Sequence, residues 1–232
     1  MRRPWTSKAA RLAGALTVSL AAAPGCSNLF HSDAKPDQTY VLRAPAPARD
    51  ADGAAATATA APGAGVLAPL QVAHPIVAPG LDGPRIILVQ PDHRMNFYVG
   101  SRWPTPLPDM LEALTVETLR ASGQWQSVQD SASPFTSEYL LSVSVRRFEA
   151  DYARGRAAPQ VEVVLDCTLG ARAGRELVTS FTAEGSAAAA GDHMSEVIAA
   201  FETASHAALD SLAQQTAAAT RAFAEHRTVT AQ

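Results

Sequence analysis

The chain has 232 residues, enough for one domain of ordinary size but few for two independent cores. Its formal net charge of −3 at pH 7 argues against a nucleic-acid binder that works by neutralising phosphates. Only two cysteines are present, which excludes a disulfide-knit scaffold and a cysteine-ligated metal cluster.

The first residues have the pattern of a secretory signal. Four basic residues between positions 2 and 11 precede an uncharged apolar run over residues 12–23. At about 1.5 Å per residue, this run is shorter than the roughly 30 Å hydrocarbon layer of a bilayer, so it does not predict a permanent span. We therefore predict a signal peptide over residues 1–25.

The segment Ala23-Pro24-Gly25-Cys26 resembles a bacterial lipobox, in which small residues precede a cysteine that accepts lipid. Lipidation of Cys26 would leave Cys167 without an intramolecular partner, as a free thiol or one that pairs between chains. Ser27 stands where an aspartate would indicate inner-membrane retention, so the resemblance implies sorting to the outer membrane. The alternative is a plain signal peptide followed by an incidental cysteine.

Composition divides the sequence that follows. We predict a lipidated N-terminus and tether over residues 26–38 and a first short strand over 39–43. Residues 44–65 are almost wholly Ala, Pro, Gly and Thr, and lack the apolar side chains that offset ordering entropy, which predicts a disordered insert. From residue 26 onward the chain carries 15 basic and 22 acidic residues, so its charge does not hold it on anionic lipid.

Residues 66–128 predict short strands and one helix. Leu70 and Val72 predict a strand that ends at His74-Pro75. A hairpin of β-rich segments, 85–90 and 95–101, follows, with a turn between them. A helix then begins with Thr105 as N-cap and ends at Gly123. Its predicted apolar stripe consists of Leu107, Met110, Leu111, Leu114 and Thr118. A short strand over 125–128 completes this part.

Three longer strands and a second helix follow. Apolar and polar residues alternate over 138–148 and 161–169, which points Cys167 inward, and a third strand covers 176–185. Successive strands with short loops predict an antiparallel meander. The last helix begins near Asp192 as N-cap and keeps its apolar stripe to Leu212. We therefore predict a two-layer α+β domain over 66–212, with a largely antiparallel sheet and two amphipathic helices on one face, and a weakly packed Ala-rich tail over 213–232.

Several of these segments together resemble the ABC-type transport auxiliary lipoprotein family, to which PqiC belongs. The resemblance covers most of the chain outside the signal and the 44–65 insert. Its residues are Cys26, Tyr40-Val41-Leu42, the segment from Arg102 to Met110 that opens the first helix, Tyr139-Leu140-Leu141, Phe148-Glu149-Ala150 and the helix from Phe201 to Leu212.

The resemblance implies a function that spacing alone does not show. It implies a non-enzymatic lipoprotein on the periplasmic face of the outer membrane, working with an MCE-domain protein, an ABC permease and an ATPase that move phospholipid or other hydrophobic cargo. The alternative is a structural envelope-assembly lipoprotein, an accessory of lipopolysaccharide export or peptidoglycan synthesis. A secreted hydrolase is a third reading, and no Gly-x-Ser-x-Gly elbow supports it.

Candidate binding residues cluster before the first helix. Arg102, Trp103 and Pro104 could contact a partner or lipid, since arginine and aromatic residues are common in interaction hot spots. Trp103 could instead fill the core. Phe97 and Tyr98 face opposite ways, which leaves one of them, with Tyr98 as the candidate, free to meet a partner. The six histidines lack the spacing of a structural zinc site, and we expect neither a metal nor a cofactor.

Overall fold

The computed structural model describes residues 36–45, 66–152 and 157–230. The predicted signal peptide, Cys26 and positions 46–65 of the predicted insert lie outside the described residues. The chain divides into two units, Met1–Lys35 and Pro36–Gln232, and every described element belongs to the second.

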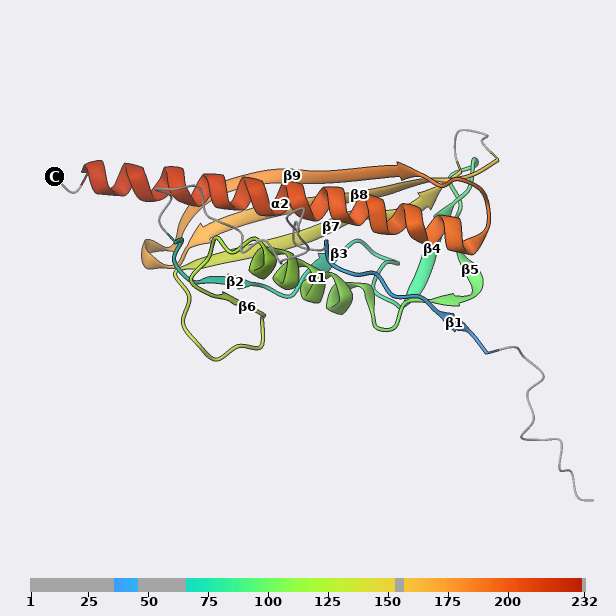
Figure 1. The fold of residues 1–232 in the computed structure, drawn as a ribbon, viewed down its shortest axis with the longest axis horizontal. Helices are drawn as coiled ribbons and strands as arrows, with labels where there is room; N and C mark the ends of the chain where they lie inside the picture. Colours follow the sequence, from blue (N-terminus) through green and yellow to red (C-terminus); the bar gives the residue numbers. More distant parts are fainter. Residues whose placement is uncertain (1–35, 46–65, 153–156, 231–232) are drawn as a thin grey trace, which may run out of the picture. The chain divides into compact units, whose positions relative to one another are not determined.

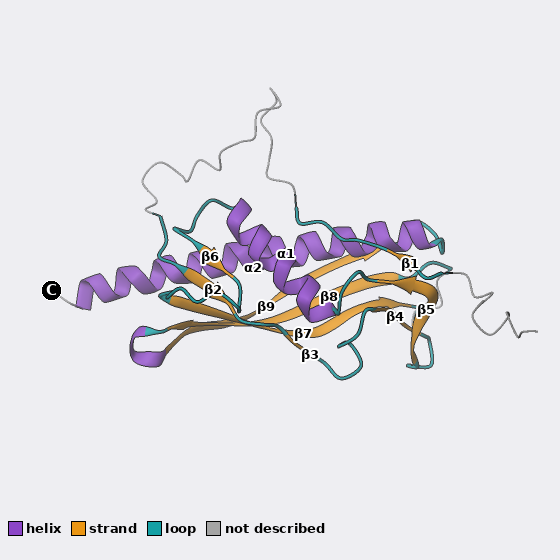
Figure 2. Ribbon diagram, turned by 90° about the horizontal axis from the view of Figure 1, so that it is seen from below, coloured by secondary structure: helices purple, strands orange, loops and turns teal. Residues whose placement is uncertain are grey.

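Nine strands, two α-helices and one 3₁₀ turn make up the described part of the chain (Figure 1). Their bounds are β1 Gln38–Thr39, β2 Leu70–Val72, β3 Ile76–Val77, β4 Arg85–Val89, β5 Met95–Arg102, α1 Leu107–Ala121, β6 Val128–Gln129, β7 Tyr139–Asp151, β8 Gln160–Ala171, the 3₁₀ turn Ala173–Arg175, β9 Glu176–Ala188 and α2 Met194–Thr230. The two helices lie on the same face of the sheet (Figure 2). The predicted two-layer α+β class is therefore confirmed.

Strand β7 is the centre of the sheet. One of its edges pairs antiparallel with β8, which in turn pairs antiparallel with β9, and this confirms the predicted meander. Its other edge is covered in turn by β2, β3 and β4, all parallel to it. Prolines at positions 75, 79 and 84 lie between these three short strands, and proline lacks the N–H that a continuous ladder needs.

A β-bulge in β7 interrupts the alternation of buried and exposed side chains. Register shifts between Val145 and Arg147, so two successive arginines, at 146 and 147, are exposed. Phe148 then returns to the helix side and is buried. On the open face, Arg146 pairs with Asp166 and Arg147 with Glu162 of β8.

Helix α1 has the predicted stripe and the predicted end. All five predicted stripe residues are buried, and Gly123 follows the C-cap with a φ of 62°. The predicted N-cap is wrong: the helix begins after Pro106, without a side-chain hydrogen bond to cap it. The run of prolines around Leu107 already fixes the backbone there.

Helix α2 is longer and better packed than predicted. It begins at Met194 rather than after Asp192, and the Glu196 carboxylate accepts a hydrogen bond from the His193 backbone N–H. No break separates residues 213–230 from the rest of the helix. Thr216 and Thr220 are buried there, because their hydroxyls donate to the carbonyls of Leu212 and Thr216 at 2.7 and 2.8 Å. The predicted weakly packed tail is therefore wrong as far as residue 220.

Two contacts fix α2 on the sheet and on the N-terminal segment. A Cβ atom built on Gly185 of β9 would lie 2.0 Å from the Ala204 carbonyl oxygen, so the helix backbone rests directly on this glycine. Nε2 of His206 lies 2.8 Å from the Arg43 carbonyl oxygen. The segment after β1 thereby joins the first half of α2. Neither described helix has the length and apolarity needed to cross a membrane.

Candidate functional site

Trp103 belongs to the core. Its side chain is 1% exposed, and its ring makes edge contacts with Phe148 and Phe201 at centroid distances of 6.0 and 5.4 Å. Its backbone N–H donates to the Pro84 carbonyl at 2.7 Å. The side chain therefore joins the end of β5 to β7 and α2, and cannot reach a partner in this structure. Of the two readings of Trp103, the core reading is the one observed.

The other three candidate residues do not form one surface. The hydroxyl oxygen of Tyr98 is 2.9 Å from that of Tyr152, whose hydroxyl donates to Asp192 ahead of α2. Burial, and then the hydrogen bond with Tyr152, raise the pKa of Tyr98 far above its usual range, so this half-buried phenol stays protonated. Arg102 and Pro104 are exposed, and Nε of Arg102 donates to the Trp103 carbonyl at 3.4 Å.

An apolar strip runs along the outer face of β5. Met95, Phe97 and Val99 are 48%, 41% and 89% exposed, and they point to the same side because alternate residues of a strand share a face. The Arg85 guanidinium lies 4.2 Å from the centre of the Phe97 ring. We call Met95, Phe97 and Val99 the β5 strip. The opposition of Phe97 and Tyr98 was visible in the sequence, but the exposure of Val99 was not.

The edge of β5 is only partly paired. β1 pairs in parallel with Ser101 and Arg102, and the Tyr40 N–H donates to the Arg102 carbonyl at 2.9 Å. In a strand, every second backbone N–H points to the same neighbouring strand. The backbone N–H groups that could face β5 before Tyr40 are therefore those of positions 38 and 36. Position 36 is a proline and has no N–H to donate. Among the described residues, nothing pairs with the outer edge of β5 from Met95 to Gly100.

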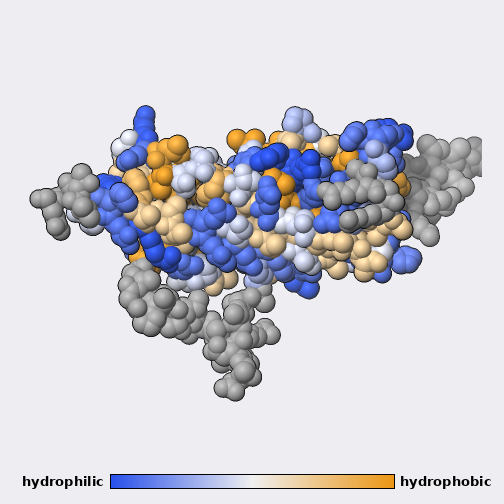
Figure 3. Space-filling view, turned by 90° about the horizontal axis from the view of Figure 1, so that it is seen from above, coloured by the Kyte–Doolittle hydropathy of each residue, from blue (hydrophilic) through white to orange (hydrophobic). Residues whose placement is uncertain are grey.

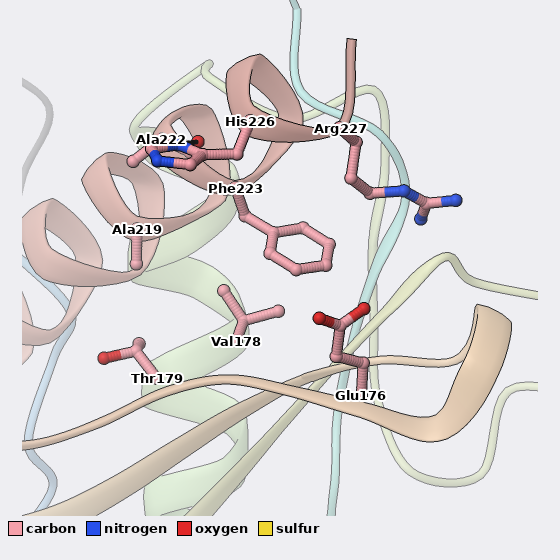
Figure 4. A pocket seen from close by; sticks show the side chains of 8 residues that line it. All are labelled: Glu176, Val178, Thr179, Ala219, Ala222, Phe223, His226 and Arg227. Carbon is pink, nitrogen blue, oxygen red and sulfur yellow. Dashed lines mark hydrogen bonds between the residues drawn. The ribbon is translucent and has the colours of Figure 1, made fainter. Parts of the chain in front are cut away.

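A second candidate surface is an open groove between the end of α2 and the start of β9 (Figure 4). Its volume is about 820 Å³. The lining residues are Glu176, Val178, Thr179, Ala219, Ala222, Phe223, His226 and Arg227. We call this the α2 groove.

The α2 groove has an apolar floor and a charged rim. The Phe223 ring packs edge-on against Tyr139 at 6.4 Å, and the Arg227 guanidinium lies 5.8 Å from its centre. Glu176 and Arg227 flank the opening (Figure 4). Seen from the side of α2 and β9, the surface shows small apolar areas separated by hydrophilic ones (Figure 3). An apolar hollow bordered by charges is typical of a contact site for a peptide or helix.

A second hollow, of about 640 Å³, lies beside α1, and most of the residues that line it are of polar or charged types. The Glu112 carboxylate is 2.7 Å from His74 Nδ1 and accepts the Ser131 backbone N–H at 2.7 Å. Burial raises the pKa of Glu112, but these hydrogen bonds outweigh it and the pKa is lowered. The described residues hold no group of three or more side chains suited to bind a metal ion. Through these two contacts, Glu112 of α1 is joined to His74, which follows β2, and to Ser131, which follows β6.

Cys167 is buried, as predicted. Its side chain is 1% exposed and is a free thiol. Burial, with a smaller effect of the Asp166 charge, raises its pKa to about 12. The thiol is therefore protonated at neutral pH and is not an activated nucleophile.

Comparison with known proteins identifies the family. The model of the ABC-type transport auxiliary lipoprotein component matches residues 33–217. The chain belongs to this family. The match begins just before β1 and ends within α2, so it includes the β5 strip and the β9 side of the α2 groove, whereas the α2 residues that line the groove lie beyond it. The predicted resemblance is thus confirmed, and with it the description as a lipoprotein of an ABC transport system.

Solved structures agree with the fold. Protein XCC0632 from Xanthomonas campestris is 27% identical, with a TM-score of 0.65 over 82% of this chain and 97% of its own. An uncharacterised protein is 19% identical, with a TM-score of 0.50 over 69% of this chain and 95% of its own, and supports the fold alone. No curated protein matches the sequence.

Proposed function

We propose that this protein is a non-enzymatic lipoprotein subunit of an MCE-type ABC lipid transport system, and that it docks the transporter to the outer membrane from the periplasmic side. The family match over residues 33–217 carries the proposal. Cys167 is buried and its pKa is raised, so this thiol is not suited to act as a nucleophile. No cofactor is part of the proposal.

The arrangement of the described residues supports a docking role with two ends. β1 lies beside β5 and the first half of α2, whereas the α2 groove lies at the last turns of that helix (Figure 1). A helix of 37 residues is about 55 Å long at about 1.5 Å per residue. Lipid on Cys26 would therefore hold the β1 end at the membrane and leave the α2 groove for the transporter.

A protein that bridges membrane and transporter suits hydrophobic cargo. Exposing acyl chains to water costs about 0.8 kcal/mol per CH₂, so a continuous path is favoured over release into the periplasm. Arg102, Pro104 and Tyr98 lie at the β1 end and remain candidates for contacts there. The α2 groove is the proposed contact with the MCE-domain protein or the permease.

Acylation and partner recovery test the proposal. Labelled palmitate should enter the wild-type protein and not the Cys26→Ser variant. Co-purification from detergent-solubilised membranes should recover an MCE-domain protein or the permease and ATPase. Recovery of lipopolysaccharide-export or peptidoglycan-synthesis components in their place would favour an envelope-assembly role and contradict the proposal.

A pair of matched variants tests the α2 groove. Ala222→Arg places a long side chain in the groove, whereas Ala224→Arg adds the same charge at an exposed position that does not line it. We expect loss of transporter recovery with Ala222→Arg alone. Equal recovery with both variants would show that the transporter docks elsewhere.

A further inference from the structure

Large apolar side chains are concentrated at the β1 end of the described structure. Eight large apolar side chains of the described residues are strongly exposed. Four of them are at this end: Met95, Phe97 and Val99 lie on β5, and Val41 follows β1. Val99 is the most exposed of them, at 89%. Apolar side chains scattered singly over a surface are ordinary, but three in a row favour a contact when they share one face of a strand whose outer edge has no partner among the described residues.

The position of β1 places this row close to the proposed anchor. Gln38 pairs with Ser101, two residues beyond Val99, and Cys26 precedes Gln38 by 12 residues. A chain of that length spans at most about 40 Å at roughly 3.3–3.6 Å per residue, so it keeps this end of the sheet near the leaflet to which it is attached. This step rests on the proposed anchoring at Cys26.

The charges beside the strip suit a lipid surface. Arg85 covers the Phe97 ring, and Arg102 is exposed where β1 pairs with β5. The nearby Asp92 carboxylate is paired with Arg94. Arginines beside exposed apolar residues are typical of interfacial contacts, because the guanidinium groups remain at the headgroup level while the apolar groups enter the leaflet.

We propose that the β5 strip inserts into the headgroup region of the leaflet that holds the acyl chains of Cys26. The acyl chains supply the attachment, and the strip sets the orientation. The β4–β5 hairpin then lies on the membrane, and the α2 groove at the far end of α2 points into the periplasm. The occupant of this surface is lipid rather than a partner strand or a second copy of the chain.

Depth-dependent quenching tests the orientation. Residues 26–232 are coupled through Cys26 to maleimide-bearing lipid in phosphatidylcholine vesicles; Cys167 is buried and protonated and does not compete. Val99→Trp adds an indole on the strip, and Phe135→Trp adds one at a site that is 73% exposed elsewhere. Because interfacial groups enter a leaflet by about 5–10 Å, lipid brominated on its acyl chains should reduce the emission added by Val99→Trp at least twofold.

The control decides between the outcomes. We expect the emission added by Phe135→Trp to be unchanged by brominated lipid. Equal quenching at both positions would mean contact without orientation, and no quenching at Val99→Trp would mean no insertion; either result overturns the proposal. The vesicle experiment attaches Cys26 to lipid chemically, so it does not depend on acylation in cells. A failure of acylation in cells would contradict the proposed anchor, whereas the quenching measurement would still decide whether the β5 strip inserts.

Discussion

Replacement of Gly185 by alanine tests the closest contact between the two layers. A Cβ atom at this position would lie 2.0 Å from the Ala204 carbonyl oxygen and 2.8 Å from the Ala208 nitrogen. Both are helix backbone atoms, so no side chain can rotate away and α2 must move off β9. Overpacking a well-packed core typically costs about 1–3 kcal/mol, and we expect Gly185→Ala to lie at the upper end of that range.

The assay is the unfolding of residues 26–232 in urea and on heating, with circular dichroism as the signal. For a domain of this size, 1 kcal/mol corresponds to a shift of roughly 2–4 °C in Tm, so Gly185→Ala should lower the Tm by about 6–12 °C. Gly185→Val should lower it further.

Gly170→Ala is the matched control on the neighbouring strand. Its added Cβ would meet the Glu176 carbonyl oxygen at 3.6 Å, an ordinary contact, and its φ is not in the left-handed region. We expect no loss of stability, or a gain of up to about 1 kcal/mol from reduced freedom of the unfolded chain. Equal stability of Gly185→Ala and Gly170→Ala would refute the reasoning that α2 rests on the backbone of β9.

Three further predictions concern buried groups. Phe201→Ala removes the ring that contacts Trp103 and Phe148 and should cost about 3–5 kcal/mol of unfolding free energy in urea; a cost below about 1 kcal/mol would contradict the observed packing. Cys167 should resist a thiol reagent at pH 8 in the native protein and react in urea, and rapid native labelling would show that it is not enclosed. Burial raises the pKa of Glu149. Just above pH 4.5 the native state therefore binds more protons than the unfolded state. As a result, the free energy of unfolding falls as pH rises through that window. Glu149→Gln should therefore be more stable than the parent at pH 7, with the difference vanishing below pH 4.5; equal stability curves would show that this carboxylate is well solvated.

The candidate surfaces were only partly predictable. The segment around Arg102 and Trp103 has residue types that are frequent in interfaces, yet Trp103 is enclosed by two phenylalanines from β7 and α2. Those rings lie 45 and 98 positions further along the chain, and no local pattern shows that they meet. The exposure of Val99 could not be predicted either, since a β-rich segment has the same sequence pattern at the edge of a sheet as at its centre.

The α2 groove was hidden by the composition of its helix. Past Leu212 the sequence is rich in Ala, Thr and Gln, so the large apolar residues that mark the buried face of the helix become rare. Small residues there, Ala213 and Ala217, and the threonines that bond to their own helix are nevertheless buried. Packing by small residues leaves little hydrophobic signal in the sequence, although it buries the helix as well as larger residues do.

The sequence by itself determined the elements whose pattern is local: the alternation of β7 and β8, the stripe and glycine end of α1, the inward Cys167 and the family. Tertiary structure alone decided that β2, β3 and β4 follow one another along β7, that β1 pairs with only the end of β5 in the described part of the chain, and that Trp103 is core. The reason is physical. Periodicity reports which face of an element is apolar, whereas strand neighbours, edges and enclosed rings depend on contacts between residues far apart in the chain.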